Sequence, residues 1–268
     1  MENGIMTQSR MEQVNKASNF STLLSSLQPI AIFLLIAAGV AWYLTVLQSQ
    51  IMGNMAGTMG MTLASYVLMW TLMMAAMMLP AITPLATRYN RVIRSYKLFG
   101  SLSFAAGYLV VWALTGILAF FSAWFTEKVL ILESSVQVFI AAATFSACGI
   151  YQFSPMKNAC LKVCRAPFSL LLKYASWRGP FRHFRVGLHH GVFCFGCCFF
   201  LMVLMFVFGV MNIAAMLVLT IVIAVEKHTA EEKILSRAVG IVCFLFAIAV
   251  FLLPELAPGL ISNMNMIK

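Results

Sequence analysis

The chain has 268 residues, of which 62% are hydrophobic and only 10% are charged, and its formal net charge at pH 7 is +10. A water-soluble domain of this length carries far more charge, so the composition excludes an ordinary soluble protein and favours a chain embedded in a bilayer. The positive charge falls mainly in loops between apolar stretches, which argues against a nucleic-acid partner.

Residues 1–28 are polar and are predicted to form a flexible N-terminal segment. The first apolar run begins near Pro29, is long enough to span, and has no convincing small-residue cleavage site, so it is not interpreted as a signal peptide. We predict one transmembrane domain over residues 29–256, followed by a short tail, 257–268. The expected fold is an all-α membrane protein, a polytopic bundle of about seven transmembrane helices, because a span needs roughly 20 apolar residues. Such stretches are centred near Ala38, Leu72, Leu114, Ala142, Leu201, Leu219 and Ala247.

The distribution of basic residues predicts the orientation of the bundle. Residues 88–97, after the second stretch, and residues 157–185, between the fourth and fifth, contain many Lys and Arg and no acidic residue. The positive-inside rule places both loops and the amino terminus in the cytoplasm of a cell (inner) membrane protein. The basic residues then serve orientation and contact with the lipid bilayer.

The second stretch, M-W-T-L-M-M-A-A-M-M-L-P, is rich in methionine. On a helix, Met69, Met73 and Met77 lie within about 80° of arc, with Met78 on a neighbouring strip. A thioether is a soft ligand that suits Cu(I). The alternative is that methionine is only a flexible apolar filler.

The fifth stretch contains H-H-G-V-F-C-F-G-C-C-F-F-L-M, which places His, Cys and Met side chains among apolar residues. His190, Cys194, Cys197 and Cys198 lie within about 100° of arc on a helix. His189 points about 100° away and is the weaker candidate ligand.

Gly187 and Gly191 allow another helix to approach closely. The expected neighbour is the fourth span, which carries Cys148. Cys243 stands alone in the last span and is interpreted as a buried small hydrophobic residue. Thiols on the cytoplasmic side stay reduced, so packing, metal binding and redox chemistry are the uses left for them.

The basic loop adds C-L-K-V-C, in which Cys160 and Cys164 share a face if the loop is helical. Nearby Lys and Arg are expected to lower the thiol pKa values and so favour thiolates that bind soft metals. We predict that at least three of these Cys and His groups share a metal ion. Glu226 and Lys227 are expected to solvate the end of the sixth span. Glu226 is the best candidate for a functional membrane carboxylate, because an ionisable group at that depth normally has a partner.

Four elements carry a resemblance: residues 69–80, residues 151–167, G-L-H-H-G-V-F-C-F-G-C-C-F-F-L-M through G-V-M-N, and the V-E-K at residues 225–227. In combination they resemble a family of uncharacterised bacterial and archaeal proteins described as predicted metal-binding integral membrane proteins. That family often has Trp after the paired cysteines, where this chain has Phe199. The resemblance implies a metal site in a helical membrane protein, and the matching positions are His190, Cys194, Cys197, Cys198, Cys160, Cys164, Met73, Met77 and Met78, with His189 a weaker one.

The leading hypothesis is a membrane protein that binds or moves Cu(I) through Met and Cys/His ligands, with a copper chaperone or membrane metalloenzyme as partner. Zinc and iron stay open, because Cys/His sets serve both. One alternative is a membrane thiol or metal oxidoreductase, since Cys194, Cys197 and Cys198 could cycle between thiol and disulfide. Another is a non-catalytic accessory subunit of a membrane metalloenzyme. Whether the chain is an enzyme is left open.

Overall fold

A computed structural model describes residues 29–52, 57–92, 97–129, 131–165, 168–179, 181–229 and 232–260, and these residues are helical apart from short links. The predicted N-terminal segment, 1–28, lies outside this part of the chain, and the predicted tail is described only to residue 260. In chain order the elements are α2 (Pro29–Met52), α3 (Leu63–Val92), α4 (Lys97–Val129), α5 (Ser134–Gln152), α6 (Pro155–Cys164), α7 (Phe168–Ser176), α8 (Arg182–Phe208), α9 (Ile213–His228), α10 (Glu232–Leu252) and the 3-10 turn η1 (Pro254–Leu256).

Six of the described helices are long and apolar enough to cross a membrane: α2, α3, α4, α5, α8 and α10. The structure thus supports six of the about seven spans that the sequence predicts. The stretch centred near Leu219 forms α9, which has 16 residues. At 1.5 Å per residue it is about 24 Å long, shorter than the roughly 30 Å hydrocarbon core.

The turn between α8 and α9 explains why α9 is short. The apolar sequence runs on without a break, but α8 stops at Phe208 and Gly209 takes a φ of 94°, which favours glycine. Asn212 then caps α9, its side-chain oxygen accepting from the backbone N–H of Ala215 at 3.1 Å. This turn separates the two apolar stretches that the sequence centres near Leu201 and Leu219, and the cap at Asn212 sets the start of the second.

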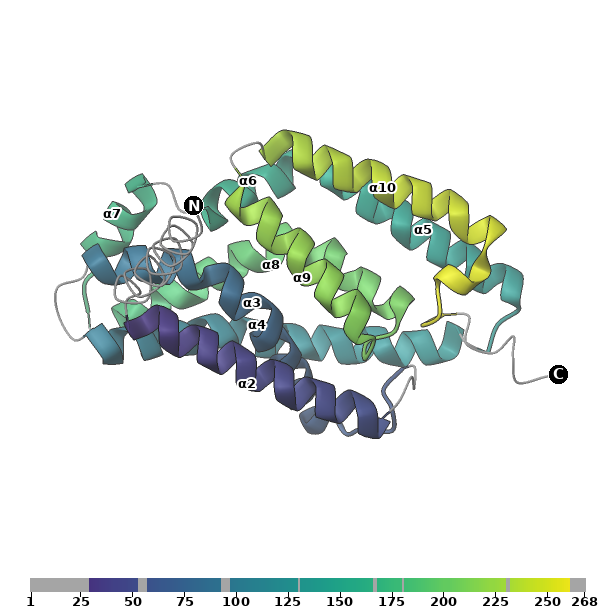
Figure 1. The fold of residues 1–268 in the computed structure, drawn as a ribbon, viewed down its shortest axis with the longest axis horizontal. Helices are drawn as coiled ribbons and strands as arrows, with labels where there is room; N and C mark the ends of the chain where they lie inside the picture. The colour runs from purple at the N-terminus through teal and green to yellow at the C-terminus, as the bar shows by residue number, and fades with distance from the viewer. Residues whose placement is uncertain are drawn as a thin grey trace, which may run out of the picture.

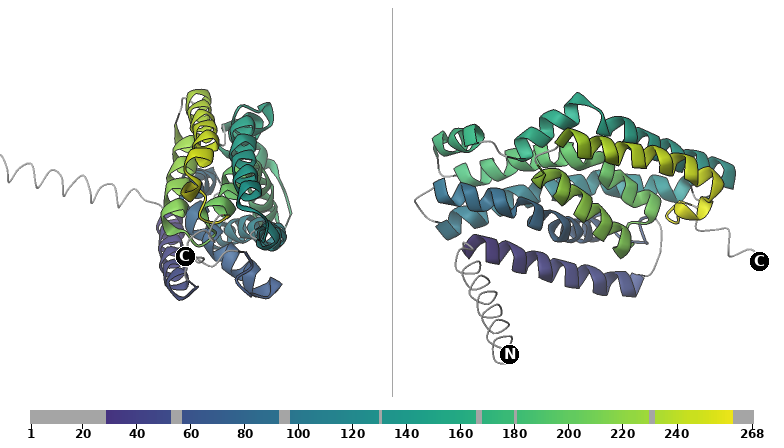
Figure 2. Two further views of the ribbon diagram at one scale, coloured as in Figure 1. Left: turned by 90° about the vertical axis from the view of Figure 1, so that its right-hand side faces the viewer. Right: turned by 45° about the horizontal axis from the view of Figure 1, so that its top comes forward.

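The helices lie nearly side by side along the long axis of the molecule, with α7 at one end and α6 between α7 and α5 (Figure 1). The most extensive packing joins α4 to α8, α2 to α3 and α5 to α10, while α6 packs on α8. Figure 2 shows α2 at one edge of the bundle and the α5–α10 pair at the other. Because α8 touches α4, α5, α6 and α9, it is the helix around which a buried site can form.

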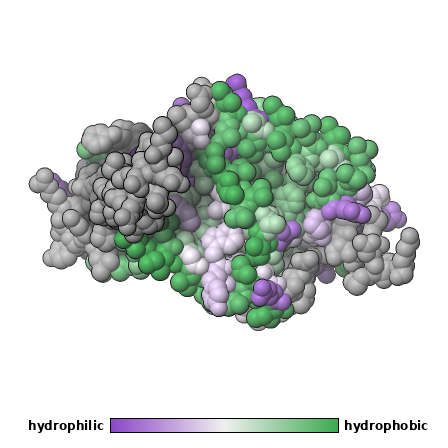
Figure 3. Space-filling view, in the orientation of Figure 1, coloured by the Kyte–Doolittle hydropathy of each residue, from purple (hydrophilic) through white to green (hydrophobic). Residues whose placement is uncertain are grey.

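Large apolar side chains cover the outer faces of the bundle. Ile36 of α2, Leu118 of α4 and Ile248 of α10 are each about 60% exposed. Figure 3 shows broad hydrophobic areas over the side of the molecule. Such a surface is disfavoured in water and suits a lipid environment.

The glycines of α8 do allow a close helix contact, but the neighbour is α4 and not the span that carries Cys148. A Cβ at Gly187 would clash with the backbone oxygen of Phe104, and a Cβ at Gly107 would clash with that of Phe184. The α4 and α8 backbones therefore meet at these two glycines. Cys148, on α5, faces another helix.

Candidate metal centre

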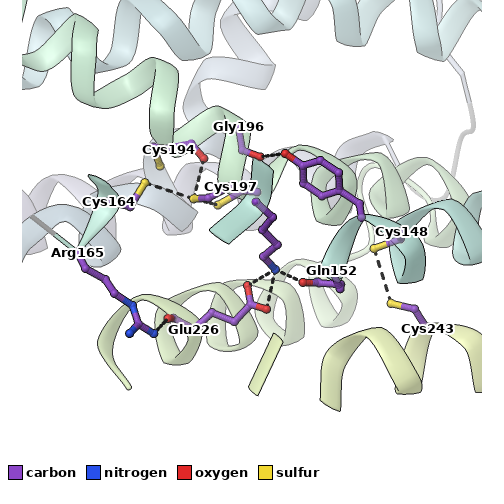
Figure 4. Close-up of polar contacts among 12 residues, drawn as sticks. Cys148, Gln152, Cys164, Arg165, Cys194, Gly196, Cys197, Glu226 and Cys243 are labelled. Atoms are coloured by element: carbon purple, nitrogen blue, oxygen red, sulfur yellow. Dashed lines mark hydrogen bonds and ion pairs between the residues drawn. The ribbon is translucent and has the colours of Figure 1, made fainter. Parts of the chain in front are cut away.

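Three buried thiols from two helices, α6 and α8, converge inside the bundle. Cys164 ends α6, while Cys194 and Cys197 lie one turn apart on α8. Their sulfur atoms are all within 4.8 Å of one another, and those of Cys164 and Cys197 are 3.3 Å apart (Figure 4). A three-coordinate ion with metal–sulfur bonds of about 2.3 Å separates its sulfurs by about 4 Å. The three thiols, called here the three-thiol group, can therefore hold one metal ion with small side-chain adjustments.

Local sequence signals place α6 so that Cys164 reaches α8. Pro155 occupies the first turn of α6, and the hydroxyl of the N-cap Ser154 accepts from the backbone N–H of Met156 at 3.1 Å. At the other end, the Arg165 guanidinium donates to the backbone oxygen of Glu226 at 2.6 Å. These contacts fix both ends of the short helix that supplies the third thiol.

The other two predicted thiols border the group. The Cys198 sulfur lies 3.4 Å from that of Cys197. Cys160 is half-buried against Gly196 of α8, where a Cβ would come within 2.8 Å of its sulfur. The C-x₃-C pair is therefore split: Cys164 joins the three-thiol group, and Cys160 packs one turn away.

The two predicted histidines diverge. His190 is buried, its ring is stacked on that of Tyr108 with 6.2 Å between centroids, and its Nδ1 has no hydrogen-bond partner among the described residues. His189 faces α7, where its Nδ1 lies 2.9 Å from the hydroxyl of Tyr174. Neither histidine is a member of the three-thiol group.

Met73, Met77 and Met78 are fully buried on α3. Met78 reaches the site, because its sulfur lies 3.8 Å from Nζ of Lys227. The three methionines thus form a buried thioether face of α3 that ends next to the site.

Lys227 is a candidate site residue that the sequence reasoning placed wrongly. It was expected to solvate the end of a span, but it is only 7% exposed, and its ammonium group donates to the Cys194 sulfur at 2.9 Å. The Tyr108 hydroxyl lies 2.9 Å from the same sulfur. A buried ammonium compensates the negative charge of a thiolate, so Lys227 is placed to act as the charge partner of a Cys194 thiolate. The V-E-K element was the signal available, but α9 had to be placed against α8 to interpret it.

Glu226 also lies inside the protein, where it is paired with Lys157. Its two oxygens accept from Lys157 of α6 at 2.7 and 2.8 Å, and both side chains are at most 3% exposed. The Lys157 ammonium also contacts Gln152. The ion pair ties α6 to α9 next to the three-thiol group (Figure 4).

The expectation of lowered thiol pKa values is wrong for α6. Burial raises the pKa of the Cys164 thiol and also that of Cys160. The reason is that Lys162 is exposed and Lys157 is neutralised by Glu226, so α6 adds little positive charge around these thiols.

The comparisons agree with a soft-metal site. The family described as PpoB2, copper chaperone, matches residues 67–250, more than half of the chain. The chain belongs to this copper chaperone family. Its function is therefore copper-related, and the match contains the three-thiol group, Lys227 and the ion pair. Neither the curated proteins nor the solved structures give a match.

Proposed function

We propose that this copper chaperone family member is a membrane protein that binds Cu(I) at Cys164, Cys194 and Cys197. The observation that carries the proposal is the convergence of three buried thiol sulfurs within 4.8 Å of one another. Thiolates are soft ligands that suit Cu(I), whereas structural zinc sites use four ligands. Cu(I) is the cargo, and Cys198 is the adjacent thiol to which it can move.

The route to this site runs along α3. Met69, Met73, Met77 and Met78 are buried in order from the outer part of α3 towards Lys227. Thioethers bind Cu(I) without releasing a proton, and thiolates bind it more strongly, so a copper ion is drawn from the methionines to the thiols. With the basic loops in the cytoplasm, as the positive-inside rule expects, this movement is inward.

Delivery is expected at the cytoplasmic end, because α6 supplies one ligand and is not itself a span. A partner copper protein or metalloenzyme that presents its own thiols can exchange ligands there one at a time. The number of ligands then stays constant as each protein sulfur is replaced by a partner sulfur.

The test is a metal analysis of the purified protein. We would purify it in detergent under reducing, anaerobic conditions, load it with Cu(I) and measure bound metal by elemental mass spectrometry. The wild type should retain copper, and a Cys164→Ser/Cys194→Ser/Cys197→Ser variant should lose the tightly bound ion. Cys160→Ser is the matched control, because it removes a thiol of α6 outside the group. Equal copper in the wild type and the triple variant would refute the proposal.

A thiol oxidoreductase is the second candidate, favoured by the 3.3 Å distance between the Cys164 and Cys197 sulfurs. Closing a disulfide needs about 2.05 Å, which a small rotation of both side chains can supply. A thiol–disulfide titration followed by alkylation distinguishes this activity from copper handling. Reversible loss of two thiols in protein that binds no copper would favour the oxidoreductase.

A further inference from the structure

A second pair of thiols lies outside the three-thiol group. Cys148 of α5 and Cys243 of α10 face each other with their sulfur atoms 3.6 Å apart. Cys148 is fully buried and Cys243 is 5% exposed. Cys243, which the sequence indicated to be a lone packing residue, therefore has a thiol partner on a different helix.

This pair is separate from the first site but close to its charged surroundings. Cys148 lies one helical turn before Gln152, the residue that contacts the Lys157 ammonium. Figure 4 shows the Cys148–Cys243 pair on one side of Glu226 and Gln152, with the three-thiol group on the other. A buried ion pair thus lies in the region between two sets of thiols.

We propose that Cys148 and Cys243 form a second, two-coordinate Cu(I) site. This inference rests on the proposed function, because it assumes that Cu(I) reaches the interior of the bundle. Two thiolates suffice for Cu(I) but not for the four-ligand sites of structural zinc or for an iron–sulfur cluster.

The geometry needs only a small adjustment. Two collinear metal–sulfur bonds of about 2.3 Å separate the sulfurs by about 4.6 Å. The present separation of 3.6 Å must therefore increase by about 1 Å. The two thiols belong to different helices, α5 and α10, so rotation of both side chains can provide this change without unwinding either helix.

The experiment is an anaerobic Cu(I) titration against a chromophoric chelator, with X-ray absorption to count the sulfur ligands. The wild type should bind about two equivalents of Cu(I). The first equivalent should show a single coordination number, and after the second the bound copper should be a mixture of two- and three-coordinate Cu(I). Cys148→Ser/Cys243→Ser should bind about one equivalent, three-coordinate. The control, Cys160→Ser, should keep about two.

The outcomes separate this inference from the proposed function. Copper that remains two-coordinate in the Cys164→Ser/Cys194→Ser/Cys197→Ser variant supports the pair as a site. A wild type that binds about one equivalent, lost in that triple variant, overturns the pair and leaves the proposed function standing. Absence of copper from every protein refutes both. If the double variant does not fold, the wild-type stoichiometry and coordination number still decide, because a single three-coordinate ion overturns the inference.

Discussion

The ammonium nitrogen of Lys227 lies 2.9 Å from the sulfur of Cys194, in a part of the protein where both side chains are buried. A cation in this position stabilises a thiolate before any metal arrives. The contact also joins α9 to α8, so the charge of α9 and the ligands of α8 form one unit.

Replacing Lys227 by Gln should weaken Cu(I) binding, because Cys194 loses the cation that compensates its thiolate. We expect a loss of about tenfold in affinity at neutral pH, at the lower end of what supporting groups contribute to metal sites. Chelator competition measures it. Lys227→Arg is the control, since it keeps the charge, and a loss of the same size in both variants would contradict the role assigned to the ammonium.

Cys164→Ser should lower Cu(I) affinity by more than about tenfold, because a ligand contributes at least as much as its supporting groups. Cys160→Ser, on the same helix and half-buried, should change the affinity little. The same competition assay compares the two variants. Equal losses would mean that α6 acts as a packing element and not as the source of a ligand.

Cu(I) affinity should increase with pH. Burial raises the pKa of Cys164, so this thiol keeps its proton at neutral pH and must release it when copper binds. Each released proton raises the apparent affinity by about tenfold per pH unit below the thiol pKa. Measuring the binding constant across about pH 6 to pH 8, with correction for the chelator's own protonation, tests the sign. A flat profile in the wild type would show that Cys164 is already a thiolate.

Glu226→Gln should destabilise the fold, because it leaves the Lys157 ammonium buried without its charge partner. Breaking a buried ion pair in this way costs about 3–5 kcal/mol. Lys157→Met/Glu226→Leu removes both charges and should recover much of the loss. Thermal unfolding in detergent gives the order of the three proteins, and a double variant less stable than Glu226→Gln would rule out the ion-pair explanation.

Replacing Met73 and Met77 by Leu should slow copper entry without removing the thiol site. Leu keeps the volume of these buried side chains, so the change in stability should stay below about 1.5 kcal/mol. Uptake of Cu(I) into proteoliposomes with a trapped chelator should fall, while equilibrium binding in detergent should stay near the wild-type value. Unchanged uptake would indicate that these methionines only pack.

Helical periodicity predicts which residues of one helix share a face, and it placed Cys194 and Cys197 together correctly. It does not predict height along the axis relative to another helix. His190 shares the face of Cys194 but lies about 6 Å nearer the N-terminal end of α8, and it is outside the three-thiol group.

Contacts between helices could not be predicted from the sequence, because periodicity does not show which helices are neighbours. For this reason Lys227 beside Cys194 and Cys148 beside Cys243 emerged only from the packing of α9 on α8 and of α10 on α5. Hydropathy gave the stretches near Leu201 and Leu219 as two separate spans, and a turn at Gly209 does separate them, but it did not show that the second helix has only 16 residues.

The short helix α9 packs on α3 and would change the electrical barrier for a copper ion on the proposed route along α3. Asn212 caps one end, and Glu226 lies near the other, buried in its ion pair. These polar groups are about 21 Å apart along the axis, about two-thirds of the hydrocarbon thickness. A monovalent cation that follows this part of the bundle therefore has a shorter low-dielectric distance to cross than it would in the surrounding lipid, and the largest part of the desolvation cost falls within that interval.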